Sequence, residues 1–402
     1  SSFPRDADRC SSSSSPSAGH LGFSTLAFPR LNMTKMSIPA VIYSTKGEQG
    51  IRMVTKTFSM RVRRQHLLCR VICAGINPVD AKFLVGDKLP HWAGEIGRSV
   101  IEGRTVGFDF SGIVVDTPSD CSQFKVGDRV FGILPAGQGT FTQYVHVPID
   151  QVAIKPSSLS FAEASSLPLV GLTALQALKI DHHLAPSQRL LVIGGSGGVG
   201  HVAIQVAKAI GAKVTTICSP SNTDFVRSLG ADKVIDYTKG NEHVLAELTE
   251  EAKANGPFDL CFDTVSSNEA KDREFQYRRM ITSKNRSRSL LAGKYVTIGG
   301  STSEWAKALV KRVCGLNLFG KEELFWVWFP NTRKTLEELG ALAESRQVRP
   351  KLAEVIPFEE SAVRNAFARL HGRRVVGKFA IQVSPEDWKL DAETSGAGQG
   401  SQ

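Results

Sequence analysis

The sequence predicts an α/β protein in which a β-rich, barrel-like domain is followed by a doubly wound parallel sheet. Two patterns along the 402-residue chain indicate this. Up to about Pro156, short apolar runs alternate with turn signals such as Gly127-Asp128 and Gly137-Gln138-Gly139. Beyond about Ser160, strand patterns alternate with helical ones, as expected for parallel strands joined by right-handed crossovers.

The predicted elements of the first domain are short strands rich in Val, Ile and Phe. They cover residues 71–73, 112–115, 129–132 and 141–145. In the second domain, runs at helical spacing separate the strands. Helices are predicted over 161–180, 198–210 and 222–229, and strands over 190–193, 213–218, 233–236, 258–263 and 294–298. The chain then forms helices near 332–344 and 360–370 and a strand over 378–383.

The composition is close to that of an ordinary globular protein, with 42% hydrophobic and 22% charged residues. No apolar run approaches the roughly 18 residues of a membrane span, which argues against an integral membrane protein. The seven cysteines are scattered and form no CxxC pair. This pattern argues against a disulfide framework and a thiolate zinc cluster, and it favours a reducing compartment.

The net charge of +10 is mostly local, because twelve Lys and Arg but only three Asp and Glu lie in residues 271–321. A basic segment can attract anions or nucleic acid, but a solvated insertion is the commoner explanation. We therefore do not expect a nucleic-acid partner.

The two ends of the chain differ in composition from the rest. Residues 1–36 contain a run of five serines and three arginines, which predicts a disordered or targeting leader. The serines and arginines favour an organellar location, mitochondrion or plastid. Asp6 and Asp8 are unusual for a transit peptide, so a cytoplasmic location is the alternative. Residues 386–402 are predicted to be a disordered tail.

The sharpest local signal is a glycine loop after strand 190–193. Gly195, Gly197 and Gly200 fit G-x-G-x-x-G between a strand and a helix, the context that gives this pattern its meaning. Gly195 permits a tight turn, Gly197 lets the backbone approach a pyrophosphate, and Gly200 lets helix and strand pack closely. The helix N-terminus adds N–H donors and a positive dipole. We therefore expect a dinucleotide site.

The same loop also spells G-x-S-x-G, the nucleophile elbow of α/β-hydrolases, at Gly194, Ser196 and Gly198. In that alternative Ser196 is the nucleophile and His371 is the plausible triad base. The complete β-rich domain before the loop and the three glycines in dinucleotide register count against a hydrolase.

The type of cofactor depends on the residues that end the next strand. NAD-binding folds usually place Asp or Glu about 20 residues beyond the loop, where the carboxylate binds the ribose 2′-hydroxyl. Here that place holds Cys218 and Ser219, and the first carboxylate is Asp224. A small hydroxyl leaves room for a 2′-phosphate without charge repulsion, so the sequence favours NADPH.

An ordered series of motifs from about Ile38 to Val383 resembles the medium-chain dehydrogenase/reductase family, in its zinc-independent, quinone oxidoreductase-like branch. The segments that carry the resemblance are residues 74–80, 106–112, 125–130 and 167–174, the glycine loop, and residues 229–237. The resemblance implies a GroES-like catalytic domain over 37–160, a Rossmann NADP-binding domain over 161–320, and a C-terminal segment, 321–385, that returns to the catalytic domain.

Zinc-dependent members of this family carry Cys where this chain has Asn77, and Gly-His-Glu where it has Gly107-Phe108-Asp109. Without Cys and His ligands a tetrahedral catalytic zinc cannot be assembled there, so we expect no metal. The resemblance then implies that NADPH delivers hydride to a quinone or to the β-carbon of an enone. The protein orients the cofactor and stabilises the developing oxyanion.

Family position assigns roles to individual residues. It places Asn77 and Asp80 beside the nicotinamide as catalytic residues, with Asn77 donating a hydrogen bond toward the acceptor carbonyl. The order Asn-Pro-x-Asp also suits an ordinary turn. The positions that align with cofactor contacts are Thr173, Ser196, Gly197, Gly198, Val199, Ser219, Tyr237, Asp263, Trp328, Phe329, Gly377 and Lys378.

Other interpretations stay open at this stage. A 2-enoyl-thioester reductase would need a long apolar channel, and a non-catalytic NADPH-binding partner or sensor protein would bind the cofactor without turnover. The family suggests a possible homodimer. Residues 266–293 form a longer and more basic connection than the family shows, and we favour a mobile insertion over a contact with a membrane surface or partner.

Overall fold

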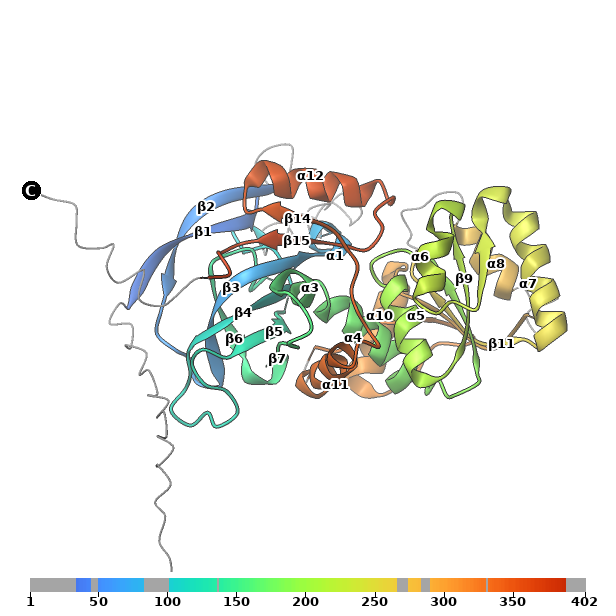
Figure 1. The fold of residues 1–402 in the computed structure, drawn as a ribbon, viewed down its shortest axis with the longest axis horizontal. Coiled ribbons are helices and arrows are strands. Elements are labelled where there is room, and N and C mark those ends of the chain that lie inside the picture. Colours follow the sequence, from blue (N-terminus) through green and yellow to red (C-terminus); the bar gives the residue numbers. More distant parts are fainter. Residues whose placement is uncertain are drawn as a thin grey trace, which may run out of the picture.

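A computed structural model of the chain shows two lobes side by side (Figure 1). The structure describes residues 34–44, 50–82, 101–135, 137–265, 274–282, 290–329 and 332–387. The predicted leader, apart from its last three residues, and the predicted tail beyond residue 387 lie outside the described residues, as does much of the basic connection. In the part of the chain that the structure describes, no helix is long and apolar enough to cross a membrane.

The first lobe is built from two sheets. Strands β1 (Lys35–Tyr43) and β2 (Ile51–Ser59) form an antiparallel pair. The larger sheet has seven strands, with β6 (Tyr144–Pro148) paired to β3 off the main path. Its other strands lie in the order β14 (Leu352–Pro357), β15 (Lys378–Gln382), β3 (His66–Ile76), β4 (Asp109–Asp116), β5 (Arg129–Ile133) and β7 (Val152–Ile154).

Both faces of β3 are buried because the sheet curls into a barrel-like body around large side chains. Phe110, Phe131 and Phe141 are fully buried in it. The backbones approach closely where the strands cross: a Cβ added at Gly112 would lie 2.1 Å from the carbonyl oxygen of Arg70. Helix α1 (Pro78–Lys82) begins directly after β3, so it holds the first predicted catalytic residues at the end of this strand.

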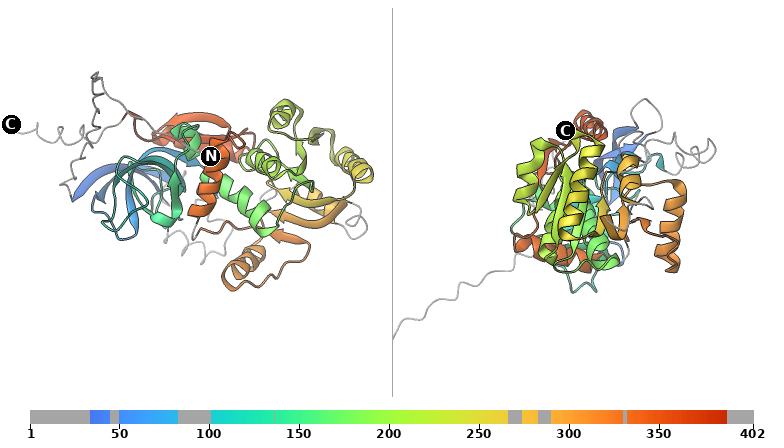
Figure 2. Two further views of the ribbon diagram at one scale, coloured as in Figure 1. Left: turned by 60° about the horizontal axis from the view of Figure 1, so that its bottom comes forward. Right: turned by 90° about the vertical axis from the view of Figure 1, so that its right-hand side faces the viewer.

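The second lobe is a six-stranded parallel sheet. Its strand order is β10 (Lys233–Asp236), β9 (Lys213–Cys218), β8 (Arg189–Ile193), β11 (Phe258–Asp263), β12 (Leu291–Thr297) and β13 (Glu322–Leu324). The chain starts at β8 and winds outward in both directions, so the strand order reverses between β8 and β11. Helices cover both faces of the sheet (Figure 2). This is the predicted doubly wound Rossmann sheet, whose ligands bind where the order reverses.

The helices of the second lobe are α5 (Gly200–Ile210), α6 (Thr223–Ser228), α7 (Asn241–Asn255), α8 (Glu274–Thr282) and α10 (Thr302–Cys314). The sequence did not predict three of them, α7, α8 and α10, although α10 begins with a capping box between Ser301 and Glu304 that could have indicated it. Strand β13 pairs with β12, so residues 322–324 belong to the Rossmann sheet rather than to a returning segment.

The helix predicted over 161–180 is broken. It divides into α3 (Phe161–Ser165), α4 (Pro168–Leu175) and a π-helical stretch, Gln176–Asp181. Pro168 explains the break, because its nitrogen has no N–H to donate to a carbonyl of the preceding turn, whereas proline is tolerated in the first turn of a new helix. Beyond the Rossmann sheet, α11 (Arg333–Glu344) and α12 (Glu360–His371) accompany β14 and β15.

The last strand, β15, pairs with β3 from the first part of the chain. Residues 379–382 of β15 pair antiparallel with residues 73–76 of β3, and the red and blue strands lie side by side in Figure 1. This strand brings Lys378 to the end of β3, next to Asn77.

Candidate active site

The glycine loop between β8 and α5 has the conformation that binds a dinucleotide, with one correction. The positive φ of the tight turn, +83°, is at Gly194, not at Gly195. Gly195 is small for another reason: an added Cβ would lie 2.0 Å from Thr216 Oγ1. At Gly200 a Cβ would lie 2.1 Å from the oxygen of Gly194, so the helix packs tightly on the strand as predicted.

Gly197 leaves room above the loop, whereas the Lys378 side chain lies against Gly198. An added Cβ at Gly197 would meet only the oxygen of Gly194, at 3.4 Å, and one at Gly198 would meet the Lys378 side chain at 3.2 Å. Helix α5 begins three residues after Gly197, so the positive end of the helix dipole lies at the same end. A backbone cradle that is open at Gly197, at a helix N-terminus, fits the pyrophosphate of a nicotinamide dinucleotide.

A small polar cluster lies at the mouth of this loop. The Asn222 side-chain nitrogen donates to Ser196 Oγ at 3.1 Å and to Ser219 Oγ at 3.0 Å. Ser221 Oγ lies 3.0 Å from Ser219 Oγ. The structure therefore brings together Ser196 and Ser219, which the sequence had singled out separately. Sequence reasoning missed Asn222, whose signal is a polar side chain four residues after the strand end.

The carboxylate of Asp236, on the strand next to β9, is held by the turn that follows it. Asp236 ends β10, beside Cys218 in the sheet, and its Oδ1 accepts hydrogen bonds from the Thr238 N–H at 2.8 Å and Oγ1 at 2.7 Å. Tyr237 follows it in a short 3₁₀ turn and is half-buried against the core of the Rossmann lobe. Cys218 ends β9 and Ser219 follows it, as the sequence predicted.

Two other predicted cofactor residues lie in the helices that face the loop. Thr173 is buried in α4, and its hydroxyl donates to the carbonyl oxygen of Leu169 at 2.7 Å. Val199 directly precedes α5 and is partly buried in the core. The structure places both near the junction of the two lobes and gives Thr173 an intrahelical partner.

Asn77 and Asp80 form one turn at the start of α1. The Asn77 N–H donates to Asp80 Oδ2 at 2.7 Å, and the Asp80 N–H donates to the carbonyl oxygen of Asn77 at 3.1 Å. The expected turn chemistry is therefore present. Both residues are almost fully buried, and Asp80 Oδ1 has no hydrogen-bond partner among the residues that the structure describes.

The Asn77 carboxamide is part of a buried ionic network. Its nitrogen donates to Asp109 Oδ2 at 3.0 Å, and its oxygen accepts a hydrogen bond from Lys378 Nζ. The same ammonium donates to the carbonyl oxygen of Ile76 at 2.8 Å and lies 3.9 Å from Asp109 Oδ2. Asp109 Oδ1 accepts from the Leu169 N–H at 2.9 Å. Sequence reasoning assigned Asp109 no role of its own.

Burial controls the charges of this network. Loss of solvent raises the pKa of Asp80 to about 8 and that of Asp109 to about 6, although Lys378 and hydrogen bonds from Asn77 oppose both shifts. Burial lowers the pKa of Lys378, and the two carboxylates oppose that shift. Burial therefore favours the protonated form of Asp80, whose Oδ2 accepts the Asn77 N–H.

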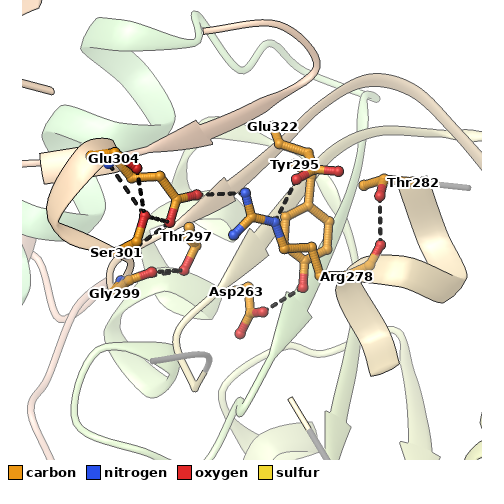
Figure 3. Close-up of polar contacts among 10 residues, drawn as sticks. Asp263, Arg278, Thr282, Tyr295, Thr297, Gly299, Ser301, Glu304 and Glu322 are labelled. Carbon is orange, nitrogen blue, oxygen red and sulfur yellow. Dashed lines mark hydrogen bonds and ion pairs between the residues drawn. The ribbon is translucent and has the colours of Figure 1, made fainter. Parts of the chain in front are cut away.

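Asp263 lies under the loop. Its side chain is fully buried at the end of β11; Oδ1 accepts from the Val265 N–H at 3.0 Å, and Oδ2 accepts from the Tyr295 hydroxyl (Figure 3). Thr264 donates from Oγ1 to the oxygen of Ile193 at 2.7 Å. Both carboxylate oxygens of Asp263 are engaged within the protein, so this residue holds the 264–265 turn against the loop.

The described part of the basic connection is a packed helix. Tyr277 and Ile281 of α8 are buried, and Arg278 reaches Glu304 Oε1 at 2.6 Å and Glu322 Oε2 at 2.5 Å (Figure 3). The expectation of a mobile insertion is thus wrong for residues 274–282, because two acidic partners and an apolar face fix the helix to the sheet. Residues 266–273 and 283–289 of the connection lie outside the described structure.

The aromatic segment before α11 reaches the first lobe. The Phe329 ring stacks on Phe108, which directly precedes Asp109, with 6.1 Å between ring centroids. Trp328 is 40% exposed and exchanges backbone hydrogen bonds with the Gln176 side chain. A separate cavity of about 640 Å³ between β7 and α11 contains none of the predicted site residues.

The loop offers no partner for a serine nucleophile. Ser196 Oγ accepts from Asn222, and His201, the nearest histidine in sequence, is engaged elsewhere. Its Nδ1 donates to the Gly197 oxygen at 2.8 Å and its Nε2 accepts from the Lys351 N–H at 3.0 Å. Burial lowers the pKa of His201 to about 4, so its ring is neutral.

Comparisons with known proteins agree with this geometry. Residues 63–157 match the model of an alcohol dehydrogenase GroES-like domain, and residues 229–381 match that of a zinc-binding dehydrogenase. The chain is 30% identical over 369 residues to the human (Homo sapiens) NAD(P)H oxidoreductase RTN4IP1, mitochondrial, which covers 86% of this chain and 89% of the relative. This chain belongs to the zinc-independent, quinone oxidoreductase-like branch of the medium-chain dehydrogenase/reductase family.

Other members of the medium-chain dehydrogenase/reductase family show the same extent of similarity. The NADPH-dependent alkenal/one oxidoreductase, chloroplastic, of Arabidopsis thaliana is 27% identical over 357 residues, covering 86% of this chain and 80% of the relative. The solved quinone oxidoreductase from Coxiella burnetii superposes with a TM-score of 0.67 at 26% identity, covering 87% of this chain and 100% of that chain.

Family membership excludes one earlier alternative and confirms the predicted fold. As a medium-chain dehydrogenase/reductase the chain is an oxidoreductase, so the α/β-hydrolase interpretation is wrong. The predicted combination of GroES-like and Rossmann domains is confirmed. Among the described residues, no group of three or more His, Cys, Asp or Glu side chains is arranged to hold a metal ion.

Proposed function

We propose that this protein is an NADPH-dependent reductase of quinones or α,β-unsaturated carbonyls. The observation that supports this most is the junction of the glycine loop with the buried Asn77–Asp109–Lys378 network. Gly377 donates its N–H to the Ser196 oxygen at 3.1 Å, and the next residue, Lys378, bonds Asn77. A dinucleotide cradle therefore lies next to a preorganised amide donor, which is what hydride transfer to a carbonyl-activated acceptor requires.

The preference for NADPH rests on the end of β9. Ser219 and its partners Ser221 and Asn222 are neutral donors, and the neighbouring Asp236 is bound by its own turn. A 2′-phosphate placed there would meet hydroxyl and amide groups, because position 219 holds a serine and not the carboxylate that would repel the phosphate. The alkenal/one oxidoreductase of Arabidopsis thaliana, an NADPH-dependent relative by name, supports the same choice.

When bound, the cofactor supplies a hydride. Asn77 then orients the acceptor: its oxygen is held by Lys378, its nitrogen faces Asp109 and Asp80, and we assign an N–H of this nitrogen as the donor to the acceptor oxygen. This donor stabilises the negative charge that develops as the acceptor is reduced. Burial raises the pKa of Asp80 and favours its protonated form, so we assign it as the local proton store for the reduced product.

The first experiment follows oxidation of NADPH and, separately, NADH with a panel of quinones and enones. We expect turnover with NADPH to exceed that with NADH by at least an order of magnitude. Asn77→Ala should keep NADPH binding within about threefold and lower kcat by roughly 10- to 1,000-fold, the usual effect of removing an oxyanion donor. Asn255→Ala, at an exposed asparagine that ends α7, is the control.

Two results would contradict the proposal. Unchanged turnover in Asn77→Ala would remove Asn77 from the site. Tight NADPH binding by the wild-type protein with no acceptor reduced would indicate the non-catalytic partner or sensor protein instead.

We also propose an organellar location, because the human relative is named mitochondrial and the Arabidopsis relative chloroplastic. A fluorescent fusion that preserves the N-terminus should colocalise with one of these organelles, and diffuse cytoplasmic fluorescence would refute the proposal. A homodimer stays a prediction. Exposed apolar side chains gather on α10, which stands out from the Rossmann lobe in Figure 2, and on the residues after it: Leu309, Val313, Leu316 and Leu318.

A further inference from the structure

The start of β15 touches both halves of the proposed site. Gly377 has φ +80°, and its N–H donates to the Ser196 oxygen of the glycine loop at 3.1 Å. A Cβ added at Gly377 would lie 2.2 Å from the Lys351 oxygen, so only glycine fits here, where the start of β15 lies against the start of β14. The position of β15 is therefore tied to the position of the loop.

The Lys378 side chain turns from the loop toward the catalytic network. Its Cδ lies 3.2 Å from where a Cβ on Gly198 would be, so the apolar stem lies against the loop. Its ammonium is buried and donates to the Ile76 oxygen at 2.8 Å and to Asn77 Oδ1. The charged end of Lys378 is thus occupied by oxygens of the first lobe, although family position aligns this residue with a cofactor contact.

Lys378 and Asp109 together fix which way the Asn77 carboxamide faces. The ammonium can only donate, so it selects the amide oxygen; the carboxylate can only accept, so it selects the nitrogen, at 3.0 Å. Asp109 is in turn held by the Leu169 N–H at the start of α4. Without the ammonium, one of the two groups that specify the amide orientation is lost, and the second N–H of Asn77 no longer has a defined direction.

We infer that Lys378 is a positioning residue: it fixes the orientation of the Asn77 carboxamide and couples that orientation to the binding of a dinucleotide on the glycine loop. The inference rests on the proposed function for its effect on turnover. The link itself depends only on dinucleotide binding: a ligand that orders the loop at Ser196–Gly198 acts through Gly377 and the Lys378 stem on residues 76–77.

The test compares the wild-type protein with Lys378→Met, which keeps the stem and removes the ammonium. Because this change leaves Asp109 as an unpaired buried carboxylate, the double variant Lys378→Met/Asp109→Asn is measured alongside it. Lys351→Met, at an exposed lysine beside Gly377, is the matched control. The measurements are the NADPH dissociation constant, kcat with saturating NADPH, and hydrogen exchange of peptides covering residues 66–80 and 194–205 with and without NADPH.

We expect both Lys378 variants to bind NADPH within about threefold of wild type and to lose on the order of 10- to 100-fold in kcat. In the wild type and in Lys351→Met, NADPH should protect both peptides. In the two Lys378 variants it should protect only residues 194–205.

A rise of tenfold or more in the NADPH dissociation constant of both Lys378 variants, with unchanged kcat at saturation, would overturn the inference and make Lys378 a phosphate contact. NADPH protection of residues 66–80 that survives in both variants would also overturn it. If the wild type reduces no acceptor yet shows the expected exchange pattern, the proposed function fails and the link stands. A wild-type protein that does not bind NADPH overturns both.

Discussion

Replacement of Asp80 by Asn tests the electrostatics of the buried network through its effect on stability. Asn has nearly the same shape and can still accept the Asn77 N–H, but it has no proton to lose. In the folded protein, burial raises the pKa of Asp80 to about 8, whereas in the unfolded chain the carboxyl has its ordinary pKa of 3.8. Between these two values the folded state holds a proton that the unfolded state has released.

The sign follows from proton linkage. Since the folded state binds more protons than the unfolded state, this group destabilises the fold progressively as pH rises from about 4 to about 8. Each pH unit corresponds to about 1.4 kcal/mol, so the wild type loses about 3 kcal/mol through Asp80 between pH 5 and pH 7. Asp80→Asn does not lose it. The free energy of unfolding of the variant relative to the wild type should therefore rise by about 3 kcal/mol over this interval.

The assay is guanidinium-induced unfolding followed by far-ultraviolet circular dichroism at pH 5, 6 and 7. Asp224→Asn, at an exposed aspartate in the first turn of α6, is the control and should run parallel to the wild type. If the difference between Asp80→Asn and wild type changes by less than about 1 kcal/mol from pH 5 to pH 7, Asp80 is ionised in the fold and the reasoning is refuted.

Three further outcomes are expected. Gly200→Ala should abolish NADPH binding or folding, because its Cβ would lie 2.1 Å from the Gly194 oxygen. Gly197→Ala, whose Cβ would lie 3.4 Å from the same oxygen, should fold with an unchanged melting temperature and bind NADPH at least tenfold more weakly. Calorimetry and titration distinguish these results, and equal behaviour of the two variants would contradict the loop geometry. Ser219→Asp should lower the ratio of NADPH to NADH affinity at least tenfold, while Ser228→Asp at an exposed site should not; an unchanged ratio would separate Ser219 from the 2′-phosphate. Arg278→Met should destabilise the Rossmann lobe by about 1–3 kcal/mol in thermal unfolding, with the exposed Arg279→Met near zero; equal effects would mean that the ion pairs to Glu304 and Glu322 do not anchor α8.

Local signals were enough to predict the glycine loop and the strands around it. A strand, three glycines and a helix in direct succession specify one conformation with few alternatives, and Gly200 packs on Gly194 as expected. The turn made by Asn77 and Asp80 is equally local, since both hydrogen bonds span three residues. The difference is the position of the tight turn, which we expected at Gly195 and which the positive φ places at Gly194, because a pattern does not distinguish neighbouring glycines.

The network around Asn77 could not be derived in the same way. Lys378 meets Asn77 across 301 residues of sequence, and Asp109 meets it across 32. Nothing in the composition near residue 378 indicates that its ammonium points away from the glycine loop. The same holds for α8: its basic composition predicted a solvated segment, but Glu304 and Glu322 from distant elements neutralise Arg278. Tertiary partners decide such cases, and a single sequence does not show them.

The placement of β15 between β14 and β3 also governs how the chain can fold as it is made. The Lys378 ammonium bonds the carbonyl oxygen of Ile76, a residue made 302 positions earlier. The first lobe is therefore discontinuous in sequence, and its sheet cannot be completed until the entire Rossmann lobe has left the ribosome. Until then residues 73–76 of β3 present an unpaired strand edge, which is the kind of surface on which nascent chains aggregate. The Rossmann lobe, continuous in sequence, is able to fold first and to deliver the last strand to the first.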